Sequence, residues 1–308
     1  MHNKSDLSNF IKEKAIETGF DDCGISSVEI LQDESLKLKD WLSAKMHADM
    51  SWMEKNIEKR KEVDLMVPGA KSVISLVLNY KPSEDLEFNS RYKISKYAYG
   101  KDYHQVIKKM LKHLAKEINK KKNISWRSFT DSAPVFEKSY AQRAGLGWIG
   151  KNSSLLNKEF GSFFFLAELV VDIELEYDKL NDFDYCGNCT KCLDSCPTEA
   201  INDDRTINSN KCISYHTIEN KSDISSSLHK KLNNYIFGCD ICQNVCPWNS
   251  KTAENKVKGF QPSEELLNLT DADWERMTEN QFNDIFKQSP LKRSGYKKIK
   301  SNIQFVNK

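Results

Sequence analysis

Apolar and polar positions along the chain repeat with two periods, which predict helices and buried strands. Residues 5–18 carry apolar side chains every three or four positions and are followed by Gly19, so we expect a helix that ends there. Residues 104–119 show the same spacing with lysines on the opposite face, which predicts a second, amphipathic helix. The runs 72–80 and 163–173 are short, continuous and apolar, as buried strands are. Together these elements predict an α+β fold, α/β-like in its alternation, for the N-terminal part.

The chain changes character near residue 176, where long apolar elements give way to Cys, Asn and Asp with short apolar pieces. Such a segment is typical of a small domain whose core is a cofactor. Further on, residues 264–284 hold seven acids, whereas 287–308 hold seven Lys or Arg and no acid. We therefore divide the chain into residues 1–175, 176–250 and 251–308, the last being a helical tail whose basic end is either an arm or a solvated surface.

Size and charge limit the function classes. The 308 residues leave room for two domains, and 39% hydrophobic residues suffice for a packed core. A net charge of +2 excludes a histone-like polycation, so any contact with nucleic acid must come from a local patch. No apolar run approaches the length of a membrane span, and the N-terminus lacks the hydrophobic stretch of a signal peptide. We expect a soluble cytoplasmic protein without membrane contact.

The cysteines carry the most specific signal. Eight of the nine lie between Cys186 and Cys246, which indicates metal binding rather than a general disulfide scaffold. Residues 186–197 read C-x2-C-x2-C-x3-C-P, the run found in bacterial ferredoxins. Residues 239–247 keep only the last three positions of that run, so one ligand must come from elsewhere. Cys212 lies between the two motifs and is the nearest candidate.

In two-cluster ferredoxins the cysteine before the proline ligates the other cluster, and this exchange predicts two complete four-thiolate sites. Cluster one takes Cys186, Cys189, Cys192 and Cys246, and cluster two takes Cys196, Cys212, Cys239 and Cys242. The alternative is a pair of zinc knuckles, which also use C-x2-C pairs but give no reason for two exchanged x3-C-P endings. Cys23, far from both motifs, is interpreted as a small buried hydrophobe.

Iron–sulfur clusters pass single electrons but select no substrate, so the chemistry is expected in the N-terminal part. That part has neither a G-x-G-x-x-G turn after a strand nor a Walker motif. It does have Asp131 before Ser-Ala-Pro, followed by Gly145, Gly147 and Gly150, which let the backbone approach a large ligand. Taken alone, Asp131 fits a turn residue and the glycines fit a structural turn.

Several segments resemble the epoxyqueuosine reductase family, iron–sulfur and cobalamin enzymes that complete queuosine in tRNA. The resemblance spans roughly residues 50–250, most of the chain. It rests on VPGAKSVISL (67–76), SKYAYGKDYH (95–104), DSAPVFEKSYAQRAGLGWIGKN (131–152), GSFFFLAELVVDI (161–173), CGNCTKCLDSCPTEAI (186–201), KCISYHTIE (211–219) and FGCDICQNVCPWN (237–249).

The resemblance implies a nitroreductase-like N-terminal domain that holds cobalamin without a histidine beneath the cobalt, and a ferredoxin domain with two 4Fe–4S clusters, cluster one being nearest the cobalt. It implies reduction of epoxyqueuosine to queuosine at the wobble position of tRNA, with electrons from an external low-potential donor. Asp131 matches the family's general acid, and we expect burial against the corrin to raise its pKa so that it protonates the departing oxygen. Candidate cobalamin contacts are Asn56, Arg60, Tyr97, Asp131, Leu155, Ser214 and Tyr215.

Two departures from the family bear on tRNA binding. His216 stands where many members have an aliphatic residue, and the helical-repeat domain that helps longer members hold tRNA is absent from this sequence. We expect a monomer that contacts tRNA through basic patches, with plain solvated surface as the equal alternative. The patches are Lys108, Lys109, Lys112, Lys116, Lys120, Lys121 and Lys122 on the predicted helix, and Lys292, Arg293, Lys297, Lys298 and Lys300 in the tail.

Two other functions remain open at this point. A corrinoid reductive dehalogenase acting on a small organohalide would share the paired ferredoxin motif. A ferredoxin-type electron carrier would keep the clusters but bind no corrinoid.

Overall fold

A four-stranded sheet forms the centre of the N-terminal part. The computed structural model describes residues 4–83, 86–180 and 183–308. The sheet order is β1-β2-β7-β4, with every neighbouring pair antiparallel. Its strands are β1 (Asp22–Ser27), β2 (Ser72–Asn79), β7 (Phe164–Val171) and β4 (Trp126–Phe129). The fold is therefore α+β, as predicted, and its antiparallel sheet separates it from the parallel α/β class.

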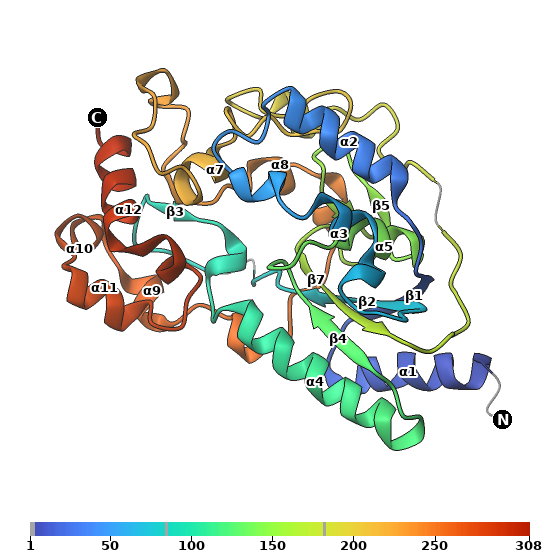
Figure 1. The fold of residues 1–308 in the computed structure, drawn as a ribbon. Coiled ribbons are helices and arrows are strands. Elements are labelled where there is room, and N and C mark those ends of the chain that lie inside the picture. The colour runs from blue at the N-terminus through green and yellow to red at the C-terminus, as the bar shows by residue number, and fades with distance from the viewer. Residues whose placement is uncertain (1–3, 84–85, 181–182) are drawn as a thin grey trace.

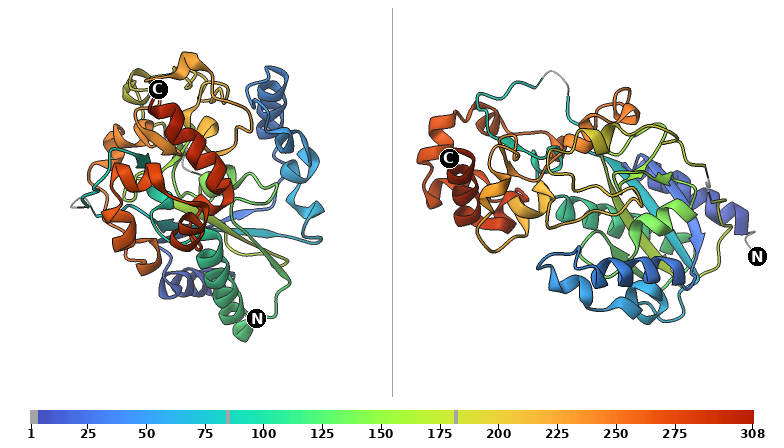
Figure 2. Two further views of the ribbon diagram at one scale, coloured as in Figure 1. Left: turned by 90° about the vertical axis from the view of Figure 1, so that its left-hand side faces the viewer. Right: turned by 90° about the horizontal axis from the view of Figure 1, so that it is seen from above.

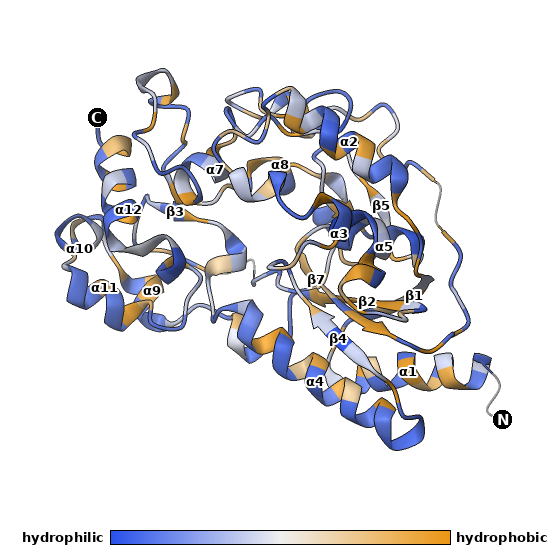
Figure 3. Cartoon of the chain, in the orientation of Figure 1, coloured by the Kyte–Doolittle hydropathy of each residue, from blue (hydrophilic) through white to orange (hydrophobic). Residues whose placement is uncertain are grey.

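Helices cover both faces of this sheet (Figures 1 and 2). On one face lie α1 (Lys4–Thr18) and α4 (Tyr103–Lys121), which confirm the two predicted helices. On the other face lies α5 (Glu137–Arg143), with the segment that carries α2 (Gln32–Ser43) and α3 (Ile57–Lys61). Both central strands are buried on both faces because each face meets a helix layer, and most of their residues are hydrophobic (Figure 3).

The cysteine-rich segment wraps along one side of this core. It forms short helices only, α6 (Lys191–Asp194), α7 (Ile213–Ile218) and α8 (Ile241–Asn244). Its strand β8 (Tyr235–Phe237) pairs in parallel with β3 (Lys93–Ile94). The β5–β6 hairpin, Trp148–Ile149 and Leu155–Leu156, lies beside the first cysteine run.

The C-terminal segment is helical, as predicted, but it is a packed unit rather than a free basic arm or a solvated end. It comprises α9 (Glu264–Asn268), α10 (Asp271–Arg276), α11 (Glu279–Ile285) and α12 (Leu291–Val306). Leu291, Ile299 and Ile303 of α12 are buried with Tyr92 and Phe237 in one hydrophobic cluster. Only the outer face of α12 carries the basic residues, because its inner face belongs to the core.

Side chains from both predicted N-terminal and C-terminal parts share this cluster, including Ile94 and Trp274. Asn302, fully buried on α12, donates from Nδ2 to the carbonyl oxygens of Thr217 and Ile236. The C-terminal helices are thus hydrogen-bonded to the cysteine-rich segment as well as packed on it.

Candidate functional site

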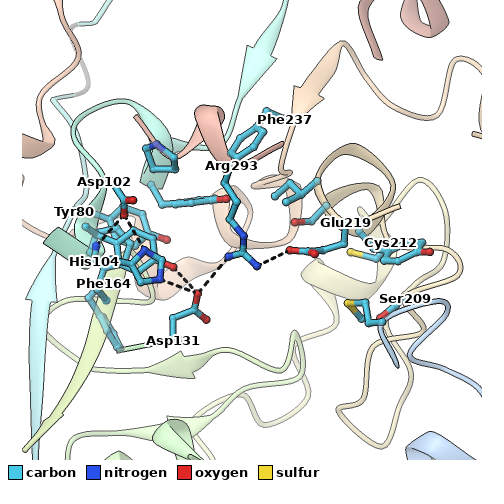
Figure 4. Close-up of a pocket in the computed structure, with 18 residues that line it drawn as sticks. Tyr80, Asp102, His104, Asp131, Phe164, Ser209, Cys212, Glu219, Phe237 and Arg293 are labelled. Carbon is cyan, nitrogen blue, oxygen red and sulfur yellow. Dashed lines mark hydrogen bonds and ion pairs between the residues drawn. The ribbon is translucent and has the colours of Figure 1, made fainter. Parts of the chain in front are cut away.

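A cavity of about 440 Å³ opens where the sheet, the cysteine-rich segment and α12 meet (Figure 4). Its walls come from the start of α4, the start of β7, α7 and the start of α12. Aromatic side chains form most of the apolar wall. The lining includes Tyr80, Tyr97, Asp102, Tyr103, His104, Asp131, Phe164, Phe165, Cys212, Ser214, Tyr215, Glu219, Phe237 and Arg293.

Asp131 lies at this cavity on the loop that follows β4. Its backbone has φ 57°, a left-handed conformation, and its N–H donates to Glu137 Oε1 at 2.6 Å. The carboxylate accepts a hydrogen bond from the Tyr103 hydroxyl at 2.7 Å. His104 Nε2 lies 3.5 Å from the same oxygen, and the Arg293 guanidinium lies 4.0 Å away. Figure 4 shows His104 and Arg293 on either side of the Asp131 carboxylate, joined to it by dashed lines.

The charges at this site favour a proton on His104 beside an ionised Asp131, and the effect of burial against a corrin on Asp131 stays a prediction. The hydrogen bond from His104, aided by that from Tyr103, lowers the pKa of Asp131 despite its partial burial. Asp102, whose Oδ1 lies 2.8 Å from His104 Nδ1, and then Asp131 raise the pKa of His104 to about 9. Because the positive imidazolium is paired with two carboxylates, His104 stays protonated at neutral pH and Asp131 stays ionised.

A buried pair of carboxyl groups lies behind the Asp131 loop. Glu168 in β7 is fully buried, and its oxygens have no N–H or O–H partner among the described residues. It interacts with Glu137, where burial and then the charge of Asp131 raise the pKa to about 7. Burial and the nearby Glu137 raise the pKa of Glu168 well above its usual range. Burial and neighbouring negative charge thus favour the protonated forms of the two carboxyls, and Glu137 accepts the hydrogen bond from the Asp131 backbone N–H.

The structure brings only part of the proposed cobalamin set to this cavity. Tyr97, Asp131, Ser214 and Tyr215 line it. Asn56 and Arg60 of the α3 region and Leu155 of β6 do not, and Leu155 is buried in a separate hydrophobic cluster.

The first predicted set of four cysteines surrounds one cavity. Cys186, Cys189, Cys192 and Cys246 line a space of about 240 Å³ beside the β5–β6 hairpin. Burial raises the pKa of Cys246, and the nearby thiols of Cys186 and Cys189 add to the rise. Among the described residues no three His, Cys, Asp or Glu side chains converge as a single-ion site requires.

The second predicted set is also grouped in space. Burial raises the pKa of Cys239 to about 12, and the nearby thiols of Cys212 and Cys196 add to the rise. Burial, followed by Cys239 and Cys212, raises the pKa of Cys242. Cys212, at the N-terminus of α7, lines the same cavity as Asp131.

The two cysteine sets lie differently with respect to the Asp131 cavity. Cys212 of the second set lines this cavity, because α7, which begins just after it, forms one wall. The first set lines a different cavity and lies in a largely exposed stretch of chain. The position of cluster one nearest the cobalt stays a prediction.

Basic residues lie beside the mouth of the Asp131 cavity. Arg293 donates to Glu219 at 3.3 Å, and both residues also line a neighbouring groove of about 470 Å³. Lys221, Lys297 and Lys298 line this groove as well. The lysines of α4 lie elsewhere, because that helix starts at the cavity with Tyr103 and runs away from it (Figure 1).

Cys23 and His216, to which the sequence assigned no catalytic role, are both packed inside the protein. Cys23 in β1 packs against the main hydrophobic core, as the interpretation of a small hydrophobe requires. His216 is buried on α7, with Nε2 at 2.8 Å from the Asn210 carbonyl oxygen and Nδ1 at 3.3 Å from Asn220 Nδ2. Burial lowers the pKa of His216.

Sequence reasoning missed His104, Tyr103, Glu137 and Arg293 as members of the site. His104 and Tyr103 end the segment SKYAYGKDYH, so their signal was in the sequence but was assigned to the face of a helix. Arg293 lies 162 positions from Asp131, and only the packing of α12 brings it there.

Two family models match this chain. The model described as "Epoxyqueuosine reductase QueG, DUF1730" matches residues 60–132. The model described as "4Fe-4S double cluster binding domain" matches residues 185–249. None of the helices formed by the described residues is long and apolar enough to cross a membrane.

Curated relatives match over almost the whole chain. An epoxyqueuosine reductase from Cellulophaga algicola is 46% identical over 99% of this chain and 100% of its own length. One from Pseudomonas aeruginosa is 41% identical over 96% of this chain and 84% of its own length.

Solved structures of proteins with the same name share the fold. A crystal structure of epoxyqueuosine reductase with an epoxyqueuosine-modified tRNA-Tyr stem loop superposes with a TM-score of 0.92 and 29% identity. That match covers 99% of this chain and 81% of the other. The structure of the enzyme from Streptococcus thermophilus gives a TM-score of 0.90 at 29% identity, over 98% of this chain and 80% of its own.

Proposed function

The chain belongs to the epoxyqueuosine reductase family, and we infer from this membership that it reduces epoxyqueuosine to queuosine at the wobble position of tRNA. The net reaction adds two electrons and two protons and releases the epoxide oxygen as water. One observation supports it above others: a proton-holding pair, His104 and Asp131, shares a cavity with Cys212. An electron carrier needs no such acid, and the relatives named as reductases favour this function over dehalogenation.

The eight clustered thiols are proposed to hold two 4Fe–4S clusters in the sets predicted from the sequence. Cys186, Cys189, Cys192 and Cys246 would hold cluster one, and the cavity between them has room for a cluster rather than a single ion. Cys196, Cys212, Cys239 and Cys242 would hold cluster two, which then lies nearer the Asp131 cavity. Electrons from an external low-potential donor would enter at the more exposed first set.

The residues at the Asp131 cavity also fit cobalamin. Tyr97, Phe164 and Phe237 offer the flat apolar walls that a large macrocycle needs. Both ring nitrogens of His104 lie next to carboxylates, so neither is free to coordinate a metal. Tyr97, Ser214 and Tyr215 would contact the group, which supplies a strongly reducing centre when bound.

We propose that His104 and Asp131 act together as the proton source. His104 holds a proton at Nε2 and delivers it to the Asp131 carboxylate, which presents it to the departing oxygen. Tyr103 orients the carboxylate through its hydroxyl, and Glu137 holds the backbone of Asp131 in its left-handed conformation. Without that proton the oxygen would have to leave as an alkoxide, which is a poor leaving group.

The groove at the cavity mouth is proposed to bind the tRNA backbone. Lys221, Lys297 and Lys298 line it, and Arg293 lies between the groove and Asp131. Phosphates flanking the wobble nucleotide would meet these cations when the modified base enters the cavity. The protein is proposed to act as a monomer in the cytoplasm, where tRNA is modified.

A reconstitution experiment tests the function directly. The purified protein is reconstituted anaerobically with iron, sulfide and cobalamin, reduced, and supplied with tRNA that carries epoxyqueuosine. We expect about eight iron and eight sulfide per chain, bound corrinoid in the visible spectrum, and queuosine in the digested tRNA. The same protein without cobalamin is the matched control. Queuosine formation at equal rate without cobalamin, or zinc in place of iron, would contradict the proposal.

A further inference from the structure

A tight turn, residues 150–154, holds one buried amide next to the first set of cysteines. Asn152 has only 5% of its surface exposed. Its Oδ1 accepts a hydrogen bond from the Ser154 backbone N–H at 3.3 Å, which fixes the orientation of the amide. Nδ2 is therefore on the opposite edge. It is buried and has no hydrogen-bond partner within the described part of the chain.

The surroundings of Asn152 point to an acceptor in the cysteine cavity. Asn152 lines the same space as Cys186, Cys189, Cys192 and Cys246. Lys151 donates from Nζ to the Gly187 carbonyl at 2.7 Å, so the turn is tied to the first cysteine loop. A buried N–H without an acceptor is costly, and such groups are rare unless a bound group satisfies them.

The position of Gly150 supports the same conclusion. A Cβ at residue 150 would lie 2.5 Å from Leu156 Cδ1 and 3.1 Å from Asn152 Oδ1. A larger side chain at residue 150 would therefore press on both Leu156 and the Asn152 amide, and glycine lets the two pack closely in this turn.

We propose that Asn152 donates a hydrogen bond from Nδ2 to a sulfur of cluster one and thereby raises the reduction potential of that cluster. The inference rests on the ligand set proposed above. A cluster becomes more negative when it is reduced, so a donor to its sulfurs stabilises the reduced form. Asn152 would then make cluster one, where electrons arrive, the easier cluster for an external donor to reduce.

The effect should be confined to one cluster, which supplies an internal control. At the second set, Cys196 Sγ accepts from the Ala200 N–H at 3.3 Å, and the Thr198 hydroxyl lies 3.6 Å away. Asn152 does not take part in these contacts, so a change at Asn152 leaves them intact.

Two variants separate the amide N–H from the structural role of the turn. Asn152→Asp keeps an oxygen for the Ser154 N–H but loses the donor and adds a negative charge. Asn152→Leu keeps the branched heavy-atom shape of the side chain, although it is bulkier, and loses both hydrogen bonds. Midpoint potentials are measured by paramagnetic resonance during redox titration of the reconstituted holoprotein, after iron analysis of each sample.

We expect a lower potential for cluster one in both variants, lower in Asn152→Asp than in Asn152→Leu, with cluster two unchanged. A coupling to an exchangeable proton at reduced cluster one should also disappear. An unchanged potential in both variants would mean that Nδ2 bonds to water, and would overturn the proposal. Loss of cluster one from both variants, or an equal shift of both clusters, would assign Asn152 a purely structural role and overturn it too. Too little iron in the parent protein would overturn the ligand sets, and this proposal with them.

Discussion

Replacing His104 by glutamine is the sharpest test of the proton source. In the parent protein the pKa of His104 is raised to about 9 by Asp102 and then Asp131, so its proton is present at neutral pH and is lost as the pH rises through about 9. Turnover should therefore be flat from pH 6 to 8 and fall above about 9. Glutamine can still donate a hydrogen bond, but it has no proton to give.

The expected loss of turnover in His104→Gln follows from the proton donor that remains in the variant, which is Asp131. Without His104, Asp131 loses the largest influence that lowers its pKa, and it must supply its own proton. A carboxyl with an ordinary pKa near 4 is protonated in about one molecule in 10³ at pH 7. We expect turnover at pH 7 to fall by roughly 10² to 10³, within the usual contribution of a general acid, and to recover partly towards pH 5.

The assay is single-turnover conversion of epoxyqueuosine in tRNA by holoprotein across pH 5 to 9.5. Equal iron and corrinoid content in each sample excludes a loading defect. His113→Gln, on the exposed face of the same helix, is the matched control. A variant that keeps the parent rate at pH 7, or that loses the same factor at every pH, would refute the role of His104.

Four further changes test separate parts of the structure. Asp131→Asn should keep corrinoid binding but lose a factor of roughly 10² to 10⁴ in turnover, and an unchanged rate would exclude it as the acid. Cys212→Ala should lose cluster two while cluster one remains, which iron analysis and paramagnetic resonance report; two intact clusters would contradict the ligand set. Reversing the charge of Lys297 and Lys298 should weaken tRNA binding and reduce the slope of log affinity against log salt by about 0.7 for each phosphate that is no longer neutralised. The same change in two lysines of α4 should do less in filter binding, and equal effects would argue against the groove. Gly161→Ala should lower the free energy of unfolding by about 1–3 kcal/mol in denaturant titration, because residue 161 has φ 61° and its Cβ would lie 2.0 Å from an asparagine oxygen.

The sequence predicted the long, strongly periodic elements and missed the short ones. The helix before Gly19 and the apolar runs at 72–80 and 163–173 correspond to α1, β2 and β7, because burial on both faces leaves a clear pattern. Strands β1 and β4 escaped notice, since DCGISS and WRSF have too few apolar residues to show a period. Their place in the sheet comes from pairing with β2 and β7, which are tertiary contacts.

The candidate site shows the same division. Cys186, Cys189, Cys192 and Cys246, one of the two sets predicted from the motif spacing, line a single cavity, whereas the assignment of all eight to two clusters stays a prediction. The sequence could not predict that the pKa of Asp131 is lowered, because this effect depends on the orientation of His104. The C-terminal tail was interpreted as an exposed basic segment because residues 287–308 hold seven Lys or Arg and no acid. Leu291, Ile299 and Ile303 nevertheless recur at helical spacing and form the buried face of α12.

The proposed exchange of the last cysteine between the two motifs would set the order in which the protein is built during synthesis. The sheet is complete once β7 has emerged at Val171, before the first clustered thiol leaves the ribosome. With the proposed ligand sets, cluster two lacks a ligand until Cys242 emerges and cluster one until Cys246, and α12 then closes over α7 and β8. A cell short of iron should therefore accumulate chains with a folded N-terminal sheet and a loose C-terminal half, which are ready targets for proteases.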